Sequence, residues 1–352
     1  MRRVFEIRRA QVQTQLCQIK LVSAVFDLIA RALVLNMKQF NGEYGCTHPG
    51  KRLGNGTRVY LPGVDYTVRT HINILHDAKL AESSQLPVNG VKGVSPLSSL
   101  LNLVNDIPLD YMHCVLEGVV KRLMHLWFDS CNHKEPYYLG KHLHIIDQLL
   151  EKQCPPHEFS RRPRSISKHL NYWKASEFKN WLLFYSVPIL KGHLPSLYYH
   201  HYVLLVSALH ILLQESISLE QLNAAEMMIK DFVSLMPELY GEKNCTANVH
   251  MLLHLPMYAR MWGPLWTQST FAFESKNGHL KQLSHGKSSF YQQMLFNIDV
   301  SQTLQLIQSI FKFDDLLMPT MLSSNLGAQP HHVACIGQHT YFLNDPSIEE
   351  PN

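Results

Sequence analysis

The sequence predicts a mainly α-helical protein with a small β element near its N-terminus. Residues 66–260 carry apolar side chains at helical spacing in consecutive stretches, whereas residues 17–27 form an apolar, β-branched run typical of a buried strand. Hydrophobic residues make up 46% of the 352 residues, enough to bury a large core. Charged residues make up only 17%, so we expect part of the surface to be covered by a partner or by further chain.

The flanking regions are predicted from the same patterns. Residues 28–40 have helical spacing, and residues 41–65 contain six glycines and two prolines, which indicates a loop. The stretch from Gly192 to Gln214 lacks Asp, Glu, Lys and Arg, but its apolar part is too short to cross a bilayer. It therefore predicts a core helix and no membrane contact. Beyond about residue 318 the helical period is lost, which predicts a tail with one short strand.

Two helices can be predicted in more detail. Residues 109–129 place one apolar stripe at helical spacing, which predicts a buried face. The residues of this stripe are Met112, Leu116, Val119, Leu123 and Trp127. Ser218 and Gln221 have the spacing of a capping box, so a helix is expected to begin there and to end near Pro237.

Composition and charge limit the classes of function. A net charge of +4 with 21 histidines permits nucleic-acid binding without requiring it. The seven cysteines are odd in number and have no short-spaced framework, which predicts reduced thiols in the nucleus or cytoplasm. The N-terminal residues are charged and lack an apolar h-region, so no signal peptide is expected.

Several polar pairs have a functional and a simpler structural interpretation. Asp110 and His113 share one face of a first helical turn, as would an N-cap aspartate with a histidine packed beside it. His250 and His254 are spaced for a metal, but the glutamate of a zinc peptidase is absent, so packing is the favoured interpretation. Cys46 lies in a glycine-rich loop without the second cysteine that a metal site needs.

Two charged segments leave alternatives open. Residues 160–168, "SRRPRSISK", form a basic loop that contacts either phosphate or only solvent. Residues 269–289, "STFAFESKNGHLKQLSHGKSS", place a single acid, Glu274, among aromatic, polar and basic residues. Glu274 is either a solvated residue at a helix start or a ligand that holds a metal ion against a phosphate backbone.

Three stretches occur in a fixed order along the chain: "AVFDLIARALVLNMKQFNGEYGC", "IPLDYMHCVLEGVVKRLMHLWFD" and "VHMLLHLPMYARMWGPLWTQSTFAFESKNGHLK". Together they resemble transposases of the CACTA (En/Spm-like) superfamily, as these occur in animal genomes, over residues 20–310. The resemblance implies a DDE transposase with a ribonuclease-H-like core that a large helical insertion interrupts before the last catalytic acid. It also implies metal-dependent cleavage and transfer of DNA strands.

The resemblance assigns roles to individual residues. Asp27 resembles the second catalytic aspartate, Glu274 the catalytic glutamate, and Asp110 and His113 the Asp-x-x-His signature. Phosphodiester chemistry uses two hard cations about 4 Å apart, so Asp27 and Glu274 are expected to bind Mg²⁺ or Mn²⁺ with oxygens within roughly 8 Å of each other. The side chains expected to contact DNA phosphates are Lys276, Lys281, Lys287, Arg161, Arg162 and Arg164.

The chain also departs from the family pattern. The first catalytic aspartate has no match, since the only acid before Asp27 is Glu6. The resemblance therefore implies an N-terminally truncated, transposase-derived protein that is catalytically incomplete and retains DNA binding. The alternatives are a domesticated helical scaffold without a nucleic-acid role, and an intact nuclease that uses a substitute acid such as Glu43. The expected partners are DNA and either a second copy or another transposase-derived chain.

The expected organisation has four parts. Residues 1–65 form a partial, incomplete ribonuclease-H-like core with the glycine-rich loop, and residues 66–260 form the helical insertion. Residues 261–317 form catalytic-type helices that carry Glu274, and residues 318–352 form the tail. Because residues 66–260 have wide apolar stripes and no long linker, we expect them to pack as one bundle against a small sheet and not as a tethered domain.

Overall fold

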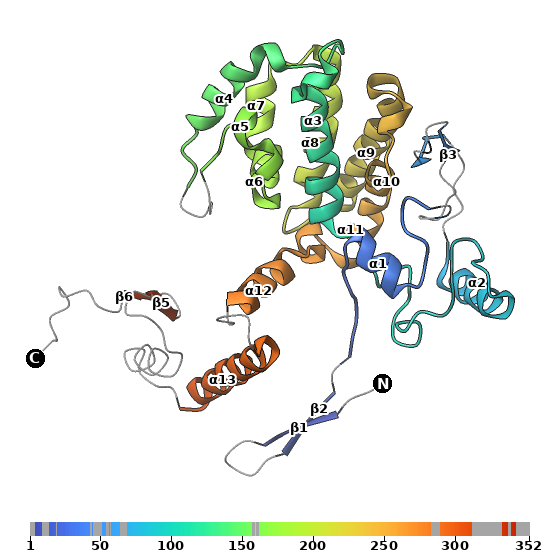
Figure 1. Cartoon of the computed structure of the whole chain (residues 1–352), viewed down its shortest axis with the longest axis vertical. Coiled ribbons are helices and arrows are strands. Elements are labelled where there is room, and N and C mark those ends of the chain that lie inside the picture. The colour runs from blue at the N-terminus through green and yellow to red at the C-terminus, as the bar shows by residue number, and fades with distance from the viewer. Residues whose placement is uncertain are drawn as a thin grey trace, which may run out of the picture. The chain divides into compact units, whose positions relative to one another are not determined.

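A computed structural model describes residues 4–8, 14–18, 20–42, 44, 51–53, 56, 58–63, 69–156, 159, 162–282, 289–311, 333–336 and 339–342. The chain divides into two compact units, Met1–Thr270 and Phe271–Asn352. The described residues are mainly helical, which confirms the predicted mainly α class (Figure 1). Within these residues, no helix has the length and apolarity needed to cross a membrane.

The first unit contains most of the helices. Its α-helices are α1 (Leu28–Val34), α2 (His71–Ser84), α3 (Lys121–Phe128), α4 (Leu143–Glu151), α5 (Ile166–His169), α6 (Ala175–Asn180), α7 (Ser186–Leu190), α8 (Ser196–Leu212), α9 (Leu219–Tyr240), α10 (Ala247–Met251) and α11 (Leu255–Trp262). The π-helices among the described residues are η1 (Met112–Val120) and η5 (Trp181–Tyr185). Short 3₁₀ turns are η2 (Ser130–Asn132), η3 (Gly140–His142), η4 (Leu170–Tyr172), η6 (Glu242–Asn244), η7 (Leu252–His254) and η8 (Leu265–Gln268).

The second unit contains α12 (Phe271–Gln282) and α13 (Phe290–Phe311).

The strands of both units form antiparallel pairs, which are β1 (Val4–Arg8) with β2 (Thr14–Gln18), β3 (Lys51–Arg52) with β4 (Arg58–Val59), and β5 (Val333–Ile336) with β6 (His339–Phe342). The pair β5 and β6 lies in the predicted tail, where the sequence had suggested a single strand. A hairpin satisfies backbone groups that one isolated strand would leave unpaired.

An aromatic core lies where α3, α8 and α9 pack together (Figure 1). Trp127 donates a hydrogen bond to the hydroxyl of Tyr240 (3.2 Å) and packs edge-on against Tyr202, with ring centroids 5.0 Å apart. His201 stacks on Phe232 with ring centroids 4.3 Å apart. Burial lowers the pKa of His201 to about 4, so this histidine is neutral at pH 7 and belongs to the core. The predicted core helix within Gly192–Gln214 is thus confirmed as α8.

The two helices predicted in detail both form. Residues 112–128 fold as η1 followed by α3, and every residue of the predicted stripe is buried. At the start of α9, Ser218 and Gln221 form the capping box, each side chain accepting from the other's backbone N–H (2.8 and 3.2 Å). The helix ends at Tyr240, close to the predicted end near Pro237, but the proline lies inside α9 and does not end it. Burial of Leu239 and Tyr240 offsets the cost of a proline within the helix.

A second apolar cluster packs residues 24–37 against residues 74–107. Its buried members are Leu35, Ile74, Ala78, Val91, Leu101, Leu103 and Ile107. The buried strand predicted for residues 17–27 is wrong in part: β2 ends at Gln18, and Leu21 and Val22 are 44% and 57% exposed. Only Phe26 makes a β-bridge, in parallel with Leu109, among the described residues of 20–27. Without strands on both sides, an apolar run does not become a buried strand.

Substitution of Gly118 in η1 tests how closely the centre of the first unit is packed. A Cβ atom at this position would lie 2.5 Å from Asn248 Nδ2 and 2.9 Å from the His113 carbonyl oxygen. Replacing Gly118 with alanine should therefore lower the free energy of unfolding by about 1–3 kcal/mol in urea denaturation. Gly278 in α12 is the control, since a Cβ there meets nothing within 4 Å. Its alanine variant should lose no stability, and equal losses in both variants would contradict the packing.

Candidate functional site

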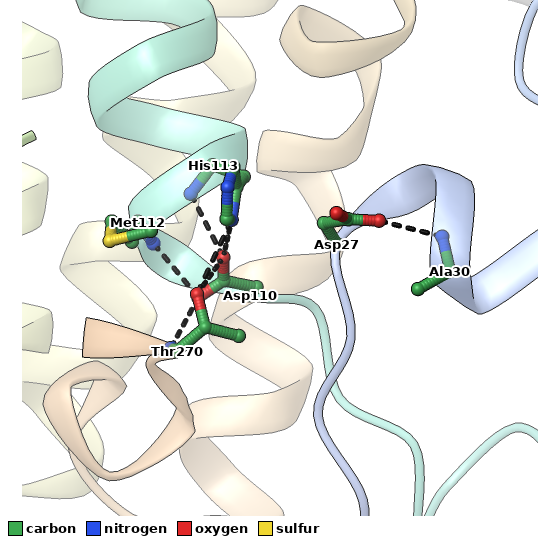
Figure 2. Close-up of polar contacts among 6 residues, drawn as sticks. All are labelled: Asp27, Ala30, Asp110, Met112, His113 and Thr270. Atoms are coloured by element: carbon green, nitrogen blue, oxygen red, sulfur yellow. Dashed lines mark hydrogen bonds and ion pairs between the residues drawn. The ribbon is translucent and has the colours of Figure 1, made fainter. Parts of the chain in front are cut away.

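Asp110 lies at the start of η1 and is 2% exposed. Its carboxylate accepts hydrogen bonds from the backbone N–H groups of Met112 (3.2 Å) and His113 (3.0 Å), as Figure 2 shows. These bonds satisfy two donors of the first helical turn, so the simpler interpretation of the Asp-x-x-His spacing, an N-terminal cap, describes part of the geometry.

The same carboxylate binds two further groups. His113 Nδ1 lies 2.5 Å from Asp110 Oδ2, and Thr270 donates from its backbone N–H and from its hydroxyl, both at 2.9 Å (Figure 2). Thr270 is 160 residues away in sequence, and the sequence analysis did not identify it. Its position directly before α12 was the available signal, because threonine is favoured at the residue that precedes a helix.

Asp110 is charged at neutral pH. Burial by itself raises the pKa of this carboxyl, but the hydrogen bonds from His113 and Thr270 together outweigh burial and hold the pKa below the usual value of an aspartate. The His113 side chain is 28% exposed. A buried carboxylate that binds Nδ1 fixes the orientation of the imidazole.

Asp27 caps the N-terminus of α1. Its Oδ1 accepts from the backbone N–H of Ala30 (2.6 Å), and its side chain turns toward that helix, whereas the Asp110 side chain turns toward His113 (Figure 2). The parallel bridge between Phe26 and Leu109 makes the two aspartates the next residues along neighbouring segments. The segments are therefore adjacent, but each carboxylate has its own partners.

Arg31 on α1 reinforces this contact. Its guanidinium donates to the carbonyl oxygens of Ile107 and Pro108, which lie just ahead of Asp110. Burial and the nearby charge of Arg31 lower the pKa of His254 to about 4. The ring of His254 packs edge-on against His250, with centroids 5.1 Å apart. This geometry agrees with the packing interpretation of the two histidines.

Glu274 belongs to the second unit, in the first turn of α12, where it is exposed. Its expected approach to Asp27 stays a prediction. Lys276 and Lys281 are also exposed on α12. Lys281 follows Glu274 by seven residues, about two helical turns, so both lie on one face, whereas Lys276 lies about 200° around the axis.

The basic loop has mixed surroundings. Arg164 forms a bidentate ion pair with Glu177, with both hydrogen bonds at 2.7 Å, and also donates to the carbonyl oxygen of Tyr172 (2.9 Å). Its guanidinium therefore has a structural role, and contact with phosphate would require this pair to open. Arg162 is exposed. The proposed residues Arg161, Lys287 and Glu43, together with Cys46, lie outside the described residues.

The donor groups of the described residues decide whether a metal centre fits. In the part of the chain that the structure describes, no group of three or more His, Cys, Asp or Glu side chains gathers. Both oxygens of Asp110 already accept hydrogen bonds. Two hard cations need several carboxylate oxygens, so the described residues of the first unit do not fit a two-cation site by themselves.

Comparisons with known proteins give no further assignment. No protein-family model matches the chain, and no curated protein matches it. The assignment to a class of protein therefore depends on the motifs of the sequence and on the contacts described above.

Because of Asp110, the free energy of unfolding should depend on pH in the acid range. A carboxyl whose pKa is lowered by folding stabilises the protein above its unfolded pKa, and this contribution is lost as pH falls through the folded pKa. Folding lowers the pKa of Asp110 from the usual value of an aspartate. The free energy of unfolding of the unmodified protein should thus fall more steeply below about pH 4 than that of Asp110→Asn. Parallel pH profiles of the two proteins, measured by urea denaturation, would contradict the prediction.

Proposed function

We propose that the chain is a transposase-derived protein whose ancestral activity is metal-dependent cleavage and transfer of DNA strands. In this proposal it acts in the nucleus or cytoplasm, binds DNA, and is catalytically incomplete. Mg²⁺ or Mn²⁺ is the cofactor of any cleavage activity that remains. An incomplete ribonuclease-H-like core, interrupted by the helices of the first unit, is part of the same proposal.

The observation that carries the proposal is the parallel pairing of Phe26 with Leu109. The resemblance assigns Asp27 to the second catalytic aspartate and Asp110 to the Asp-x-x-His signature, and each of them follows a residue of this bridge. Parallel pairing needs a long crossover connection, and the residues between the two segments supply one. This support comes from backbone geometry and adds to that of the sequence motifs.

His113 and the lysines of α12 supply the proposed contacts to DNA. Asp110 orients the imidazole of His113 through Nδ1, which suits a role in positioning a phosphate. Lys281 shares its helix face with Glu274, so a phosphate backbone that passes Glu274 meets a cation about two turns further on. Lys276 contacts DNA only if the backbone also reaches the other side of α12.

One observation favours the alternative, a helical scaffold that binds protein. The N-terminal half of α13 exposes large apolar side chains, namely Phe290, Tyr291, Leu295 and Phe296. A cluster of exposed apolar side chains is typical of a surface that binds another chain. This surface suits self-association or another transposase-derived chain, and such binding is compatible with either function.

The salt dependence of DNA affinity separates the two functions. Binding of a short labelled DNA duplex, measured by fluorescence anisotropy, should weaken steeply with salt because phosphate contacts release counterions. The double variant Lys276→Ala/Lys281→Ala should lower the slope of log affinity against log salt by about 0.9 if only Lys281 contacts a phosphate, and by about 1.8 if Lys276 does so as well. The control is Lys152→Ala/Lys191→Ala, which removes two exposed lysines of the first unit. Equal slopes in both double variants would favour the scaffold.

The unmodified chain is expected not to nick DNA. Only Asp27 and Glu274 match the catalytic acids that the resemblance implies, and losing one carboxylate removes a ligand from a site that must hold two divalent cations. The assay is supercoiled plasmid with Mn²⁺, with Glu274→Gln as control. Nicking that disappears in the control would show that a substitute acid completes the site.

A further inference from the structure

Residues 104–110 form hydrogen bonds with the segment of chain that precedes α12. The lead-in segment, residues 258–270, contains α11 and η8, and its polar groups bind residues 104–110 in matching order. The hydrogen bonds run from Tyr258 Oη to the Val104 carbonyl oxygen (3.1 Å), from Trp262 Nε1 to the Asn105 carbonyl oxygen (2.7 Å), and from Thr270 N–H and Oγ1 to the Asp110 carboxylate (both 2.9 Å).

The last of these contacts differs from the others in charge and in position. Asp110 is a buried carboxylate, and hydrogen bonds to a charged group are stronger than bonds between neutral groups. Thr270 is the last residue of the first unit, and α12 begins at the next residue. Gln268 adds a second anchor, because its side chain donates to the carbonyl oxygens of Tyr258 (3.2 Å) and Gly263 (3.1 Å). The chain is thus held by the first unit up to the start of α12.

We propose that Asp110 is a positioning residue. Its carboxylate accepts the two hydrogen bonds of Thr270, a contact called the grip below, and thereby stabilises the start of α12. This helix carries Glu274 and the lysines that are proposed to contact DNA. The importance of this positioning for DNA rests on the proposed function. The stabilisation of α12 by the contact between Asp110 and Thr270 does not depend on the proposed function. A purely local role would leave α12 unaffected: Asp110 would cap η1 and hold His113, and its bonds to Thr270 would be incidental.

Hydrogen exchange of the whole chain tests the grip. Asp110→Asn removes the charge, and Thr270→Val removes the hydroxyl while keeping the shape of the side chain. Both variants should speed exchange of the amides of residues 275–282 by about tenfold or more, since a bond to a charged group is lost at the helix start. Thr270→Ser keeps the hydroxyl and should retain the exchange rates of the unmodified protein.

Glu177→Gln is the matched control for a general loss of stability. It removes the charge of another buried carboxylate that binds its partner within the first unit. It should lower stability and leave the exchange of residues 275–282 unchanged. Unchanged exchange in Asp110→Asn and Thr270→Val, or equal acceleration in Glu177→Gln, would overturn the proposal.

DNA affinity is measured on the same proteins. If the contact between Asp110 and Thr270 serves DNA binding, Asp110→Asn and Thr270→Val should weaken the affinity for DNA. Thr270→Ser should keep the affinity of the unmodified protein. If even the unmodified protein shows no salt-dependent DNA binding, the proposed function fails, while the exchange experiment still decides whether Asp110 stabilises α12. The two failures are therefore distinguishable.

Discussion

The carboxylate of Asp110 is the interaction on which the geometry of the candidate site depends. A buried, isolated carboxylate would be strongly unfavourable or would become protonated. Here the first turn of η1, His113 and Thr270 all donate to it, which keeps it charged despite burial. If any one of these donors is removed, the remaining donors stabilise the buried charge less well. The start of a central helix, the orientation of an imidazole and the end of the first unit therefore depend on a single charge.

This dependence makes residues 104–110 a junction between parts of the chain that are far apart in sequence. On one side they hold the segment that carries Asp27, through the Phe26–Leu109 bridge and the bonds of Arg31. On the other side they hold residues 258–270. Many bonds at this junction use backbone carbonyl groups, which every residue has, so side-chain identity specifies only part of the arrangement.

For this reason the sequence predicts the helices better than it predicts the site. The stripe from Met112 to Trp127 and the Ser218 capping box follow from local spacing, and both form as predicted. The partner of Asp110 is 160 residues away, and nothing in the local pattern of Thr270 distinguishes a grip on Asp110 from an ordinary N-cap. The strand predicted for residues 17–27 fails for a related reason, because a β-branched run becomes a buried strand only when neighbouring strands pair with it.

Glu274 is followed along α12 by the positively charged Lys276 and Lys281. An acid in the first turn of a helix is stabilised by the helix dipole whether or not it has a function, so its position alone does not favour the metal-ligand interpretation. The helix face is more informative, because Lys281 shares it and Lys276 does not. A helix start that merely needed solvation would have no reason to be gripped by a buried charge. The hydrogen bonds of Thr270 to the charged Asp110 carboxylate are understandable if the helical order of the first turns of α12 matters for function.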